Sequence, residues 1–279
     1  MGKLMTVIER GPLKFELRDS PRGLHESDRA AFFQVVLLGE YELTLRNLDK
    51  GDIVVDCGAN IGCFTLLVAS LVGPQGSVIA VEPHPGNIAH LRRTVALNHF
   101  ESVSIVGCAL GAVDGKEVGL AGKGVTCTLD LAAGPAATTS TTITLGTLMA
   151  QLGPKPARAL KIDVEGTGTE MFRRQSDIDV LRNAKFVVAE VHSELAYNYT
   201  LDKLGRCGFT VGAPRWESDC MLSLVRELAR DPIQAARLYG KAAIPVACRI
   251  LSGTVEHPRG SWTKQRREFQ PFLLEARRV

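Results

Sequence analysis

A short apolar run that ends in an acid and breaks into a glycine turn is the feature that most constrains the fold of this chain. The run covers residues 53–57, includes Asp56 and leads into a turn that begins at Gly58. An apolar helix pattern over residues 64–72 follows, and a second apolar run ends in Glu82. Elements in this order predict a parallel α/β sheet that binds a ligand at the carboxyl ends of its strands.

The turn lacks the spacing of a phosphate-binding loop. A dinucleotide site uses Gly-x-Gly-x-x-Gly, whereas here Asn60 stands midway between Gly58 and Gly62. Asp56 would repel a pyrophosphate but could attract an ammonium group, and Glu82 could accept hydrogen bonds from ribose hydroxyls in pairs. The predicted ligand therefore carries a ribose and a positive charge but no phosphate, and S-adenosylmethionine meets these conditions. The alternative is a chance Asp and Gly in an ordinary strand, turn and helix.

Several motifs resemble those of FkbM-type methyltransferases. They are Asp-Cys-Gly-Ala-Asn-Ile-Gly at 56–62, Val-Glu-Pro-His-Pro at 81–85, Leu-Lys-Ile-Asp-Val-Glu-Gly at 160–166, Ala-Glu-Val-His at 189–192 and Gly-Glu-Tyr-Glu at 39–42. The motif at 160–166 is the most distinctive, and the resemblance covers roughly residues 35–225. Cys57 replaces a more usual aliphatic residue, and Gly168 stands where the family usually has an acid. The resemblance implies an S-adenosylmethionine-dependent methyltransferase, and no role is carried over for the missing acid.

The alternation of strand and helix patterns predicts a doubly wound, mostly parallel, Rossmann-like sheet of seven strands. The resemblance implies that the last strand runs antiparallel to the others. Before the sheet we expect a short strand or hairpin in residues 5–18 and a helix that Asp28 caps. The expected strands are 53–57, 78–82, 103–108, 159–164, 186–191, 208–211 and 220–225, and the expected helices after the first strand are 64–72, 86–98, 145–152 and 195–207.

Three regions are predicted along the chain. Residues 1–50 form a lead-in, residues 51–226 form the methyltransferase core with a β insertion at 111–145, and residues 227–279 form a helical basic extension. From Arg226 onward there are eleven Lys and Arg residues against five Asp and Glu residues. Such a tail could face nucleic acid, an anionic substrate or a partner, although a solvated helical extension is the simpler interpretation.

Three residues near the ends of the later strands are candidates for catalysis. A hydroxyl acceptor is a poor nucleophile, so a base beside it is useful. Asp163 is the first candidate, His192 is the second because imidazole titrates near neutral pH, and Glu165 could position either. Alternatively, the two acids cap the following helix and His192 bonds a loop. With Glu190 these acids could also hold Mg²⁺, although no metal site is predicted.

The predicted donor site lies around the glycine turn. The N–H groups after Gly58 would meet the methionine carboxylate at the helix start, with Asp56 near the amino group and Glu82 on the ribose. By resemblance to related sites, the backbone at 108–109 is placed at the adenine edge. The predicted cofactor-binding residues are Asp56, Gly58, Asn60, Gly62, Glu82, Pro83, Cys108 and Ala109.

Three functions are compatible with these observations. The leading hypothesis is methyl transfer to a hydroxyl group of a small molecule, a sugar or a glycan precursor. The basic tail suggests an RNA methyltransferase instead, but no motif for a base nitrogen and no RNA-binding module is visible. An inactive nucleoside-binding scaffold is the third, because of Gly168. The absence of a long apolar run and the seven scattered cysteines favour a cytoplasmic protein with buried free thiols and no membrane span.

Overall fold

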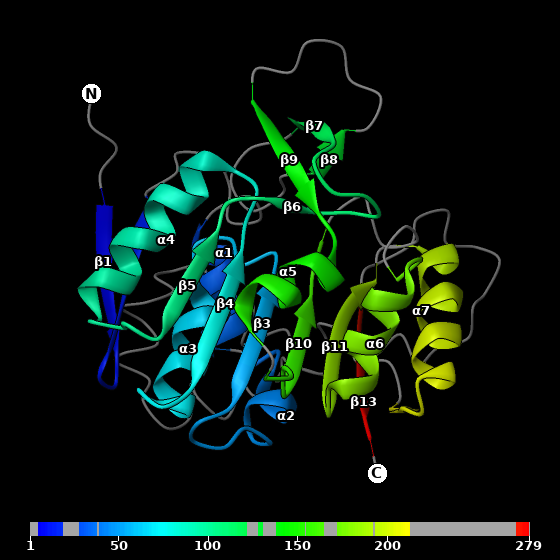
Figure 1. Ribbon diagram of the computed structural model, residues 1–279. Helices are drawn as coiled ribbons and strands as arrows, with labels where there is room; N and C mark the ends of the chain where they lie inside the picture. Colours follow the sequence, from blue (N-terminus) through cyan, green and yellow to red (C-terminus); the bar gives the residue numbers. More distant parts are fainter. Residues whose placement is uncertain are drawn as a thin grey trace, which may run out of the picture.

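A seven-stranded central sheet organises the protein. The computed structural model describes residues 5–18, 28–37, 39–121, 128–130, 138–153, 155–164, 172–191, 193–212 and 272–278. The strand order is β12-β13-β11-β10-β3-β4-β5 (Figure 1). Their bounds are β3 Ile53–Cys57, β4 Ser77–Val81, β5 Val103–Val106, β10 Ala159–Ile162, β11 Phe186–Val191, β12 Thr210–Val211 and β13 Phe272–Arg277. The mostly parallel, doubly wound α/β sheet is thus confirmed.

The antiparallel strand of this sheet comes from the end of the chain. Phe272–Arg277 (β13) inserts between β11 and β12 and runs antiparallel to both. The sequence pattern had placed this strand at 220–225, which lies outside the described residues, and had predicted a helix for the whole of 227–279. The helical prediction is wrong for Phe272–Arg277, because this segment pairs as a strand with β11 along its whole length. The three predicted regional boundaries stay predictions.

Helices lie on both faces of the sheet, as Figure 1 shows. Residues of α3 share one face with strand residues such as Val54 and Val78, whereas α5, α6 and α7 pack against the opposite face with residues such as Val55 and Leu160. Successive strand residues point to opposite faces, which explains this division. The bounds are α2 Glu42–Leu45, α3 Cys63–Val72, α4 Pro85–Leu97, α5 Leu145–Leu152, α6 Gln175–Asn183 and α7 Glu194–Arg206.

An N-terminal hairpin packs beside α4. Strands β1 (Met5–Arg10) and β2 (Leu13–Arg18) pair antiparallel, as expected for residues 5–18. Helix α1 (Asp28–Phe32) continues into the π-helical segment η2 (Phe33–Leu37). Phe15 and Phe32 meet edge to face with ring centroids 5.1 Å apart. This contact attaches the lead-in to the core that α3 and α4 share.

The predicted β insertion forms a second, smaller sheet. Its strands are β6 Ala109–Leu110, β7 Glu117–Ala121, β8 Thr128–Asp130 and β9 Thr139–Ile143, in the order β6-β9-β7-β8. In Figure 1 this sheet lies beyond the carboxyl ends of the central strands. It is therefore on the side of the molecule where a ligand of such a sheet binds.

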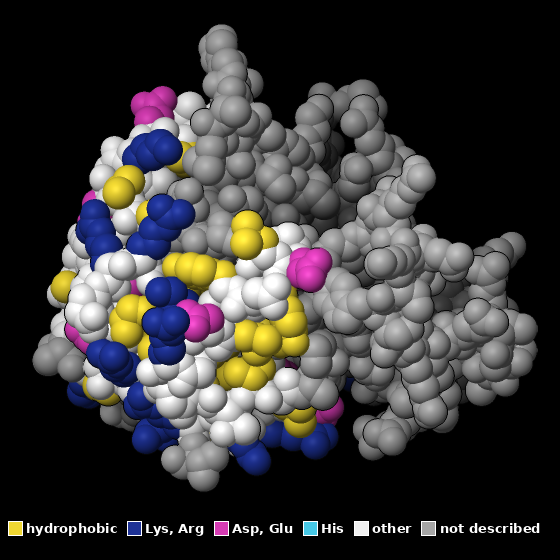
Figure 2. All heavy atoms as spheres, turned by 90° about the vertical axis from the view of Figure 1, so that its right-hand side faces the viewer, with side chains coloured by type: hydrophobic (Ala, Val, Ile, Leu, Met, Phe, Trp, Pro, Cys, Tyr) yellow, Lys and Arg dark blue, Asp and Glu magenta, His cyan; other side chains and the backbone are white. Residues whose placement is uncertain are grey.

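The surface beside α7 carries mixed charge. Figure 2 shows Lys and Arg side chains over much of the described surface on this side, with hydrophobic side chains between them. Arg206 pairs with Asp202 at 2.8 Å and Arg182 with Asp179 at 3.3 Å. Exposed ion pairs of this kind contribute about 0–1 kcal/mol each. These charges have the character of a solvated helical surface.

Two further expectations concern membrane spans and the state of the cysteines. Among the described residues, no helix combines the length and the apolar character needed to cross a membrane. Four of the seven cysteines lie in the described part, and all four are free thiols. Three of them, Cys57, Cys63 and Cys207, are buried, in agreement with the prediction of buried free thiols.

Candidate functional site

Four residues form one row across the carboxyl edge of the sheet. Cys57 is in register with Val81 and Ile162, and Ile162 is in register with Ala189. The next residue of each strand extends this row in the order Glu82, Gly58, Asp163 and Glu190. Adjacent parallel strands place such residues side by side and on one face. The structure therefore brings the predicted donor-side and acceptor-side residues together.

The glycine turn is in close contact with the strand that carries Asp163. Gly58 has φ +82°, and a Cβ atom built on it would lie 1.8 Å from the carbonyl oxygen of Asp163. Asn60 also adopts the left-handed region, with φ 52°. Only glycine permits this approach, because it has no Cβ and tolerates positive φ. The first glycine thus determines how closely the two halves of the site meet.

Most of the turn's amide groups bond within the protein. The N–H groups of Gly58 and Ala59 both donate to the carbonyl oxygen of Val81 at 2.9 Å. The N–H group of Asn60 donates to Glu82 Oε2 at 2.8 Å. These three amides do not face a ligand in this structure, contrary to the expectation for the N–H groups directly after Gly58. The first turn of α3 remains as the place where backbone amides could meet the ligand's carboxylate, because Gly62 provides no side-chain cap there.

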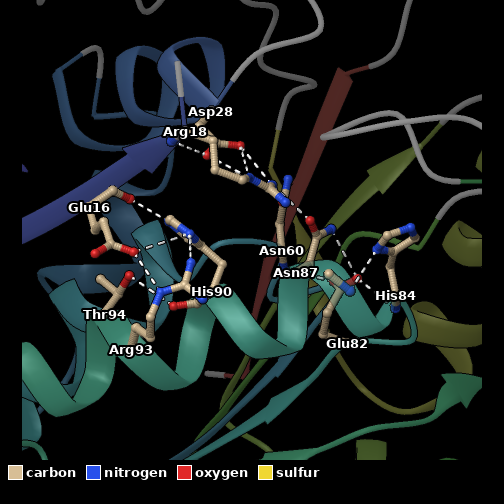
Figure 3. Close-up of polar contacts among 11 residues, drawn as sticks. Glu16, Arg18, Asp28, Asn60, Glu82, His84, Asn87, His90, Arg93 and Thr94 are labelled. Atoms are coloured by element: carbon tan, nitrogen blue, oxygen red, sulfur yellow. Dashed lines mark hydrogen bonds and ion pairs between the residues drawn. The ribbon is translucent and has the colours of Figure 1, made fainter. Parts of the chain in front are cut away.

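Glu82 is buried and accepts three hydrogen bonds. Besides the Asn60 amide on Oε2, its Oε1 accepts from the His84 amide at 3.0 Å and from Asn87 Nδ2 at 3.2 Å (Figure 3). Burial raises the pKa of Glu82, and these hydrogen bonds oppose the rise. A carboxylate has about four acceptor positions. Oε2 can therefore accept about one more hydrogen bond, rather than the pair of ribose bonds expected from the sequence.

A polar network joins Glu82 to the N-terminal hairpin. Asn87 accepts a hydrogen bond from Arg18 at 2.8 Å, and Arg18 donates from two of its nitrogen atoms to the buried carboxylate of Asp28 (Figure 3). Asp28 is the first residue of α1, and its carboxylate accepts hydrogen bonds from Arg18 at the end of β2. Sequence reasoning missed this network, because its members come from β2, α1, α4 and the end of β4, and no motif connects them.

Asp56 points into the protein and not towards a ligand. Its side chain is fully buried; Oδ2 accepts from the Thr65 hydroxyl at 2.6 Å, and Oδ1 lies 3.2 Å from Lys161 Nζ. Oδ2 thus has a hydrogen-bond partner within the chain, whereas Oδ1 has an ion-pair partner and accepts no hydrogen bond. The hypothesis that Asp56 lies near the ammonium group of the ligand finds no support in this geometry. The buried carboxylate instead connects β3 to α3 and β10.

The predicted acceptor side contains two carboxyl groups and a buried tyrosine. Asp163 Oδ2 lies 3.1 Å from Lys161 Nζ, and the Asp163 side chain is 27% exposed. Burial raises the pKa of Glu190 well above its ordinary value, and the charges of Asp163 and Glu40 and a hydrogen bond with Asp163 raise it further. Burial, Glu40 and Asp163 also raise the pKa of Tyr41. Glu190 therefore keeps its proton to a higher pH than an ordinary glutamic acid, and Asp163 is its hydrogen-bond neighbour.

The other predicted residues divide into two groups. Pro83 is half-buried beside Glu82, and Cys108 precedes β6 with its Sγ 3.8 Å from Thr141 Oγ1. Ala109 is buried in the small sheet, where it pairs with Thr142. Gly62 has φ +93° and precedes α3. The candidates Glu165 and His192, like Gly168, lie outside the described residues.

Metal ligation has no support in the described part of the chain. No group of three His, Cys, Asp or Glu residues there is arranged to hold a metal ion. The predicted absence of a metal site stays a prediction for the whole chain, because Glu165 is not among the described residues.

The fold and this edge define the class of the protein. Six parallel strands with one antiparallel strand, a glycine turn after the first of them and an acid after the second form a Rossmann-like methyltransferase fold. The model of the methyltransferase FkbM domain matches residues 56–211, which is more than half of the chain. The chain therefore belongs to the FkbM methyltransferase family and uses S-adenosylmethionine.

Individual relatives are distant or cover little of the chain. Methyltransferase 1 of Beauveria bassiana is 36% identical over 61 residues, which are 22% of this chain and 24% of that protein. The chain thus matches about a quarter of the length of this curated relative. Outside that segment the family match, and not this relative, is what relates the chain to known proteins.

Solved structures resemble the chain only weakly. An rRNA methylase from Streptococcus thermophilus has 10% identity and a TM-score of 0.45, with 86% of this chain and 95% of that chain covered. An S-adenosylmethionine-dependent O-methyltransferase from Thermotoga maritima has 13% identity and a TM-score of 0.40, with coverages of 95% and 74%. A Streptococcus mutans protein in complex with S-adenosylhomocysteine has 11% identity and a TM-score of 0.44, with coverages of 86% and 98%. At these TM-scores the three structures do not indicate which acceptor the protein methylates.

The residues at the edge fit the methyl donor. Asn60 has a buried Oδ1 atom without a hydrogen-bond partner, next to the amide that binds Glu82. A buried acceptor of this kind is costly unless a donor satisfies it, and ribose hydroxyls and an amino group are donors. The uncapped start of α3 suits a carboxylate. Asn60, Glu82 and the first turn of α3 are therefore the groups suited to holding S-adenosylmethionine.

Proposed function

We propose that the protein transfers a methyl group from S-adenosylmethionine to a hydroxyl group of a small molecule, a sugar or a glycan precursor. The observation that carries this proposal is the position of Asp163, a partly exposed carboxylate in the same row as Gly58 and Glu82. A hydroxyl acceptor must lose a proton during the transfer, and a carboxylate at the acceptor position can take it.

Different residues of the site would have different roles in this reaction. The bound donor supplies a methyl group on a sulfonium, and Glu82 and Asn60 hold its ribose. Asp163 accepts the proton of the acceptor hydroxyl, and Glu190, whose pKa is raised, orients the Asp163 carboxylate through their hydrogen bond. The remaining rate enhancement would come from the alignment of acceptor and donor, since a fixed near-attack geometry lowers the barrier substantially.

Glu82 provides a direct test of the donor site. We expect Glu82→Ala to weaken S-adenosylhomocysteine binding at least about tenfold, because it removes the acceptor that faces the ribose and the partner of the Asn60 amide. Calorimetry should compare S-adenosylhomocysteine with its 2′-deoxyribose and 3′-deoxyribose analogues. Wild type should prefer the parent compound over at least one of these analogues, and Glu82→Ala should lose that preference.

Two controls make this comparison decisive. Exposed Glu101, just after α4, gives the matched variant Glu101→Ala, which should bind like wild type. If Glu82→Ala retains the wild-type preference for both hydroxyl groups, the ribose assignment is wrong. If wild type binds neither S-adenosylmethionine nor S-adenosylhomocysteine, the proposed function itself fails.

The acceptor class requires a separate experiment. Cell extracts can be fractionated into glycan, lipid, small-molecule, RNA and protein pools and incubated with labelled S-adenosylmethionine and the enzyme. The proposal predicts label in a hydroxyl-bearing small-molecule or glycan pool, as an ether identified by mass spectrometry. Asp163→Asn should abolish this labelling. Label on RNA bases or on protein nitrogen would refute O-methyl transfer.

A further inference from the structure

Lys161 occupies an unusual position for a charged residue. It lies in β10 between Leu160 and Ile162, its side chain is only 4% exposed, and it is in direct register with Asp56 of β3. A lysine is almost never buried unless it is paired. This side chain therefore has partners that compensate for its burial.

The ammonium group of Lys161 has three acceptor oxygen atoms within 3.2 Å. These are the carbonyl oxygen of Gly58 at 3.0 Å, Asp163 Oδ2 at 3.1 Å and Asp56 Oδ1 at 3.2 Å. The contact with Gly58 is a hydrogen bond and the two carboxylate contacts are ion pairs, so all three neighbours favour the charged form of the lysine. Burial lowers the pKa of Lys161, but Asp163 and Asp56 outweigh it and the pKa lies above its ordinary value.

Aromatic rings enclose the same group. Nζ lies 5.5 Å from the ring centroid of Tyr41 and 5.9 Å from that of Phe64, and these two rings meet edge to face at 5.0 Å. Ring faces attract a cation and exclude water from it. Lys161 is thus held in place from the α2 and α3 side and cannot itself reach a substrate.

The three oxygen partners belong to the two functional halves of the site. Gly58 begins the methyl-donor turn, Asp56 lies in β3 just before it, and Asp163 is the carboxylate assigned to the acceptor. We propose that Lys161 is a positioning residue that joins the donor turn to Asp163, so that the two halves of the site keep one relative position. This inference rests on the proposed function for the roles of the two halves, but the connection itself rests on the three contacts.

A charge-balanced double-mutant cycle tests the connection. Lys161→Met alone would leave the buried Asp56 unpaired and could fail to fold, so it is combined with Asp56→Asn into a neutral pair. Asn at position 56 can still accept the Thr65 hydrogen bond. The four proteins are wild type, Asp163→Asn, the neutral pair, and the neutral pair with Asp163→Asn. Calorimetry then measures the Kd of S-adenosylhomocysteine for each.

The proposal predicts strong coupling in this cycle. Asp163→Asn should weaken binding about fivefold or more in wild type, since allosteric couplings of this size are common. In the neutral pair the same substitution should change binding less than about twofold, because Lys161 no longer transmits the change. Effects of Asp163→Asn that are equal in the two backgrounds would overturn the proposal. A purely stabilising lysine would give that result.

A matched lysine and a second readout complete the test. Lys185 is exposed before β11, and Lys185→Met should leave the effect of Asp163→Asn unchanged. The backbone amide resonance of Asn60, which lies beyond the direct contact between Gly58 and Asp163, should shift on Asp163→Asn in wild type and not in the neutral pair. If wild type binds no S-adenosylhomocysteine, the proposed function fails, and this resonance still decides the role of Lys161.

Discussion

Gly58→Ala should damage this protein much more than an alanine at another glycine with the same backbone conformation. Gly58 has φ +82°, and an added Cβ would lie 1.8 Å from the Asp163 carbonyl oxygen, where at least 3.0 Å is needed. The turn and β10 must therefore separate by about 1.2 Å. That movement strains the ladder bond from the Asp163 amide to Cys57, which is 3.0 Å long.

Gly51 provides the matched control for Gly58→Ala. It has φ +89°, and nothing lies within 4 Å of the position that an added Cβ atom would take. Both alanines incur the left-handed backbone penalty of about 1–2 kcal/mol. Only Gly58→Ala adds overpacking, which costs about 1–3 kcal/mol. The difference between the two variants therefore measures the contact between the glycine turn and β10.

Urea unfolding followed by circular dichroism measures both variants. We expect Gly58→Ala to lower the free energy of unfolding by roughly 2–5 kcal/mol and Gly51→Ala by about 1–2 kcal/mol. Calorimetry should show that Gly51→Ala binds S-adenosylhomocysteine like wild type, whereas Gly58→Ala loses most of its affinity. Equal losses of stability in the two variants would refute the argument that the turn and β10 are in direct contact.

Two further predictions concern the buried acids. Thr65→Val removes the 2.6 Å hydrogen bond to Asp56 and should lower the free energy of unfolding by about 1.5–3 kcal/mol, whereas Thr65→Ser should stay near wild type; a loss for Thr65→Val under about 0.5 kcal/mol in urea titrations would contradict this. Burial, Asp163 and Glu40 raise the pKa of Glu190 above 4.5, so its contribution to stability is full below pH 4.5 and is lost as the pH rises through the folded-state pKa. Glu190→Gln should therefore gain stability relative to wild type as the pH rises above 4.5, and a difference that does not change with pH would show that Glu190 titrates normally.

The sequence predicted most of the central sheet correctly. Apolar runs bounded by glycine and acids identified β3, β4, β10 and β11 almost to the residue, because strands covered on both faces have an unmistakable composition. The same pattern failed for β13. Its partners lie far away in the chain, and local composition cannot show which of two distant segments pairs with β11.

The sequence predicted the positions of some residues of the candidate site but not the direction of others. Glu82 and Asp163 stand where expected, at the ends of their strands. Asp56 was predicted to face the ligand, but its strand position directs it towards Lys161 and Thr65. A lysine between two apolar residues of a buried strand was the available signal for this pairing, since burial requires a partner.

By itself the sequence determined the class of fold, the family and the strand ends at which the site lies. These follow from local patterns, in which composition, period and spacing act within a few tens of residues. Only the tertiary structure decided which carboxylates lie partly exposed at the carboxyl edge of the sheet and which are paired inside the protein. That decision depends on register between strands, which sets Asp56 beside Lys161 and Gly58 beside Asp163 across about a hundred residues of chain.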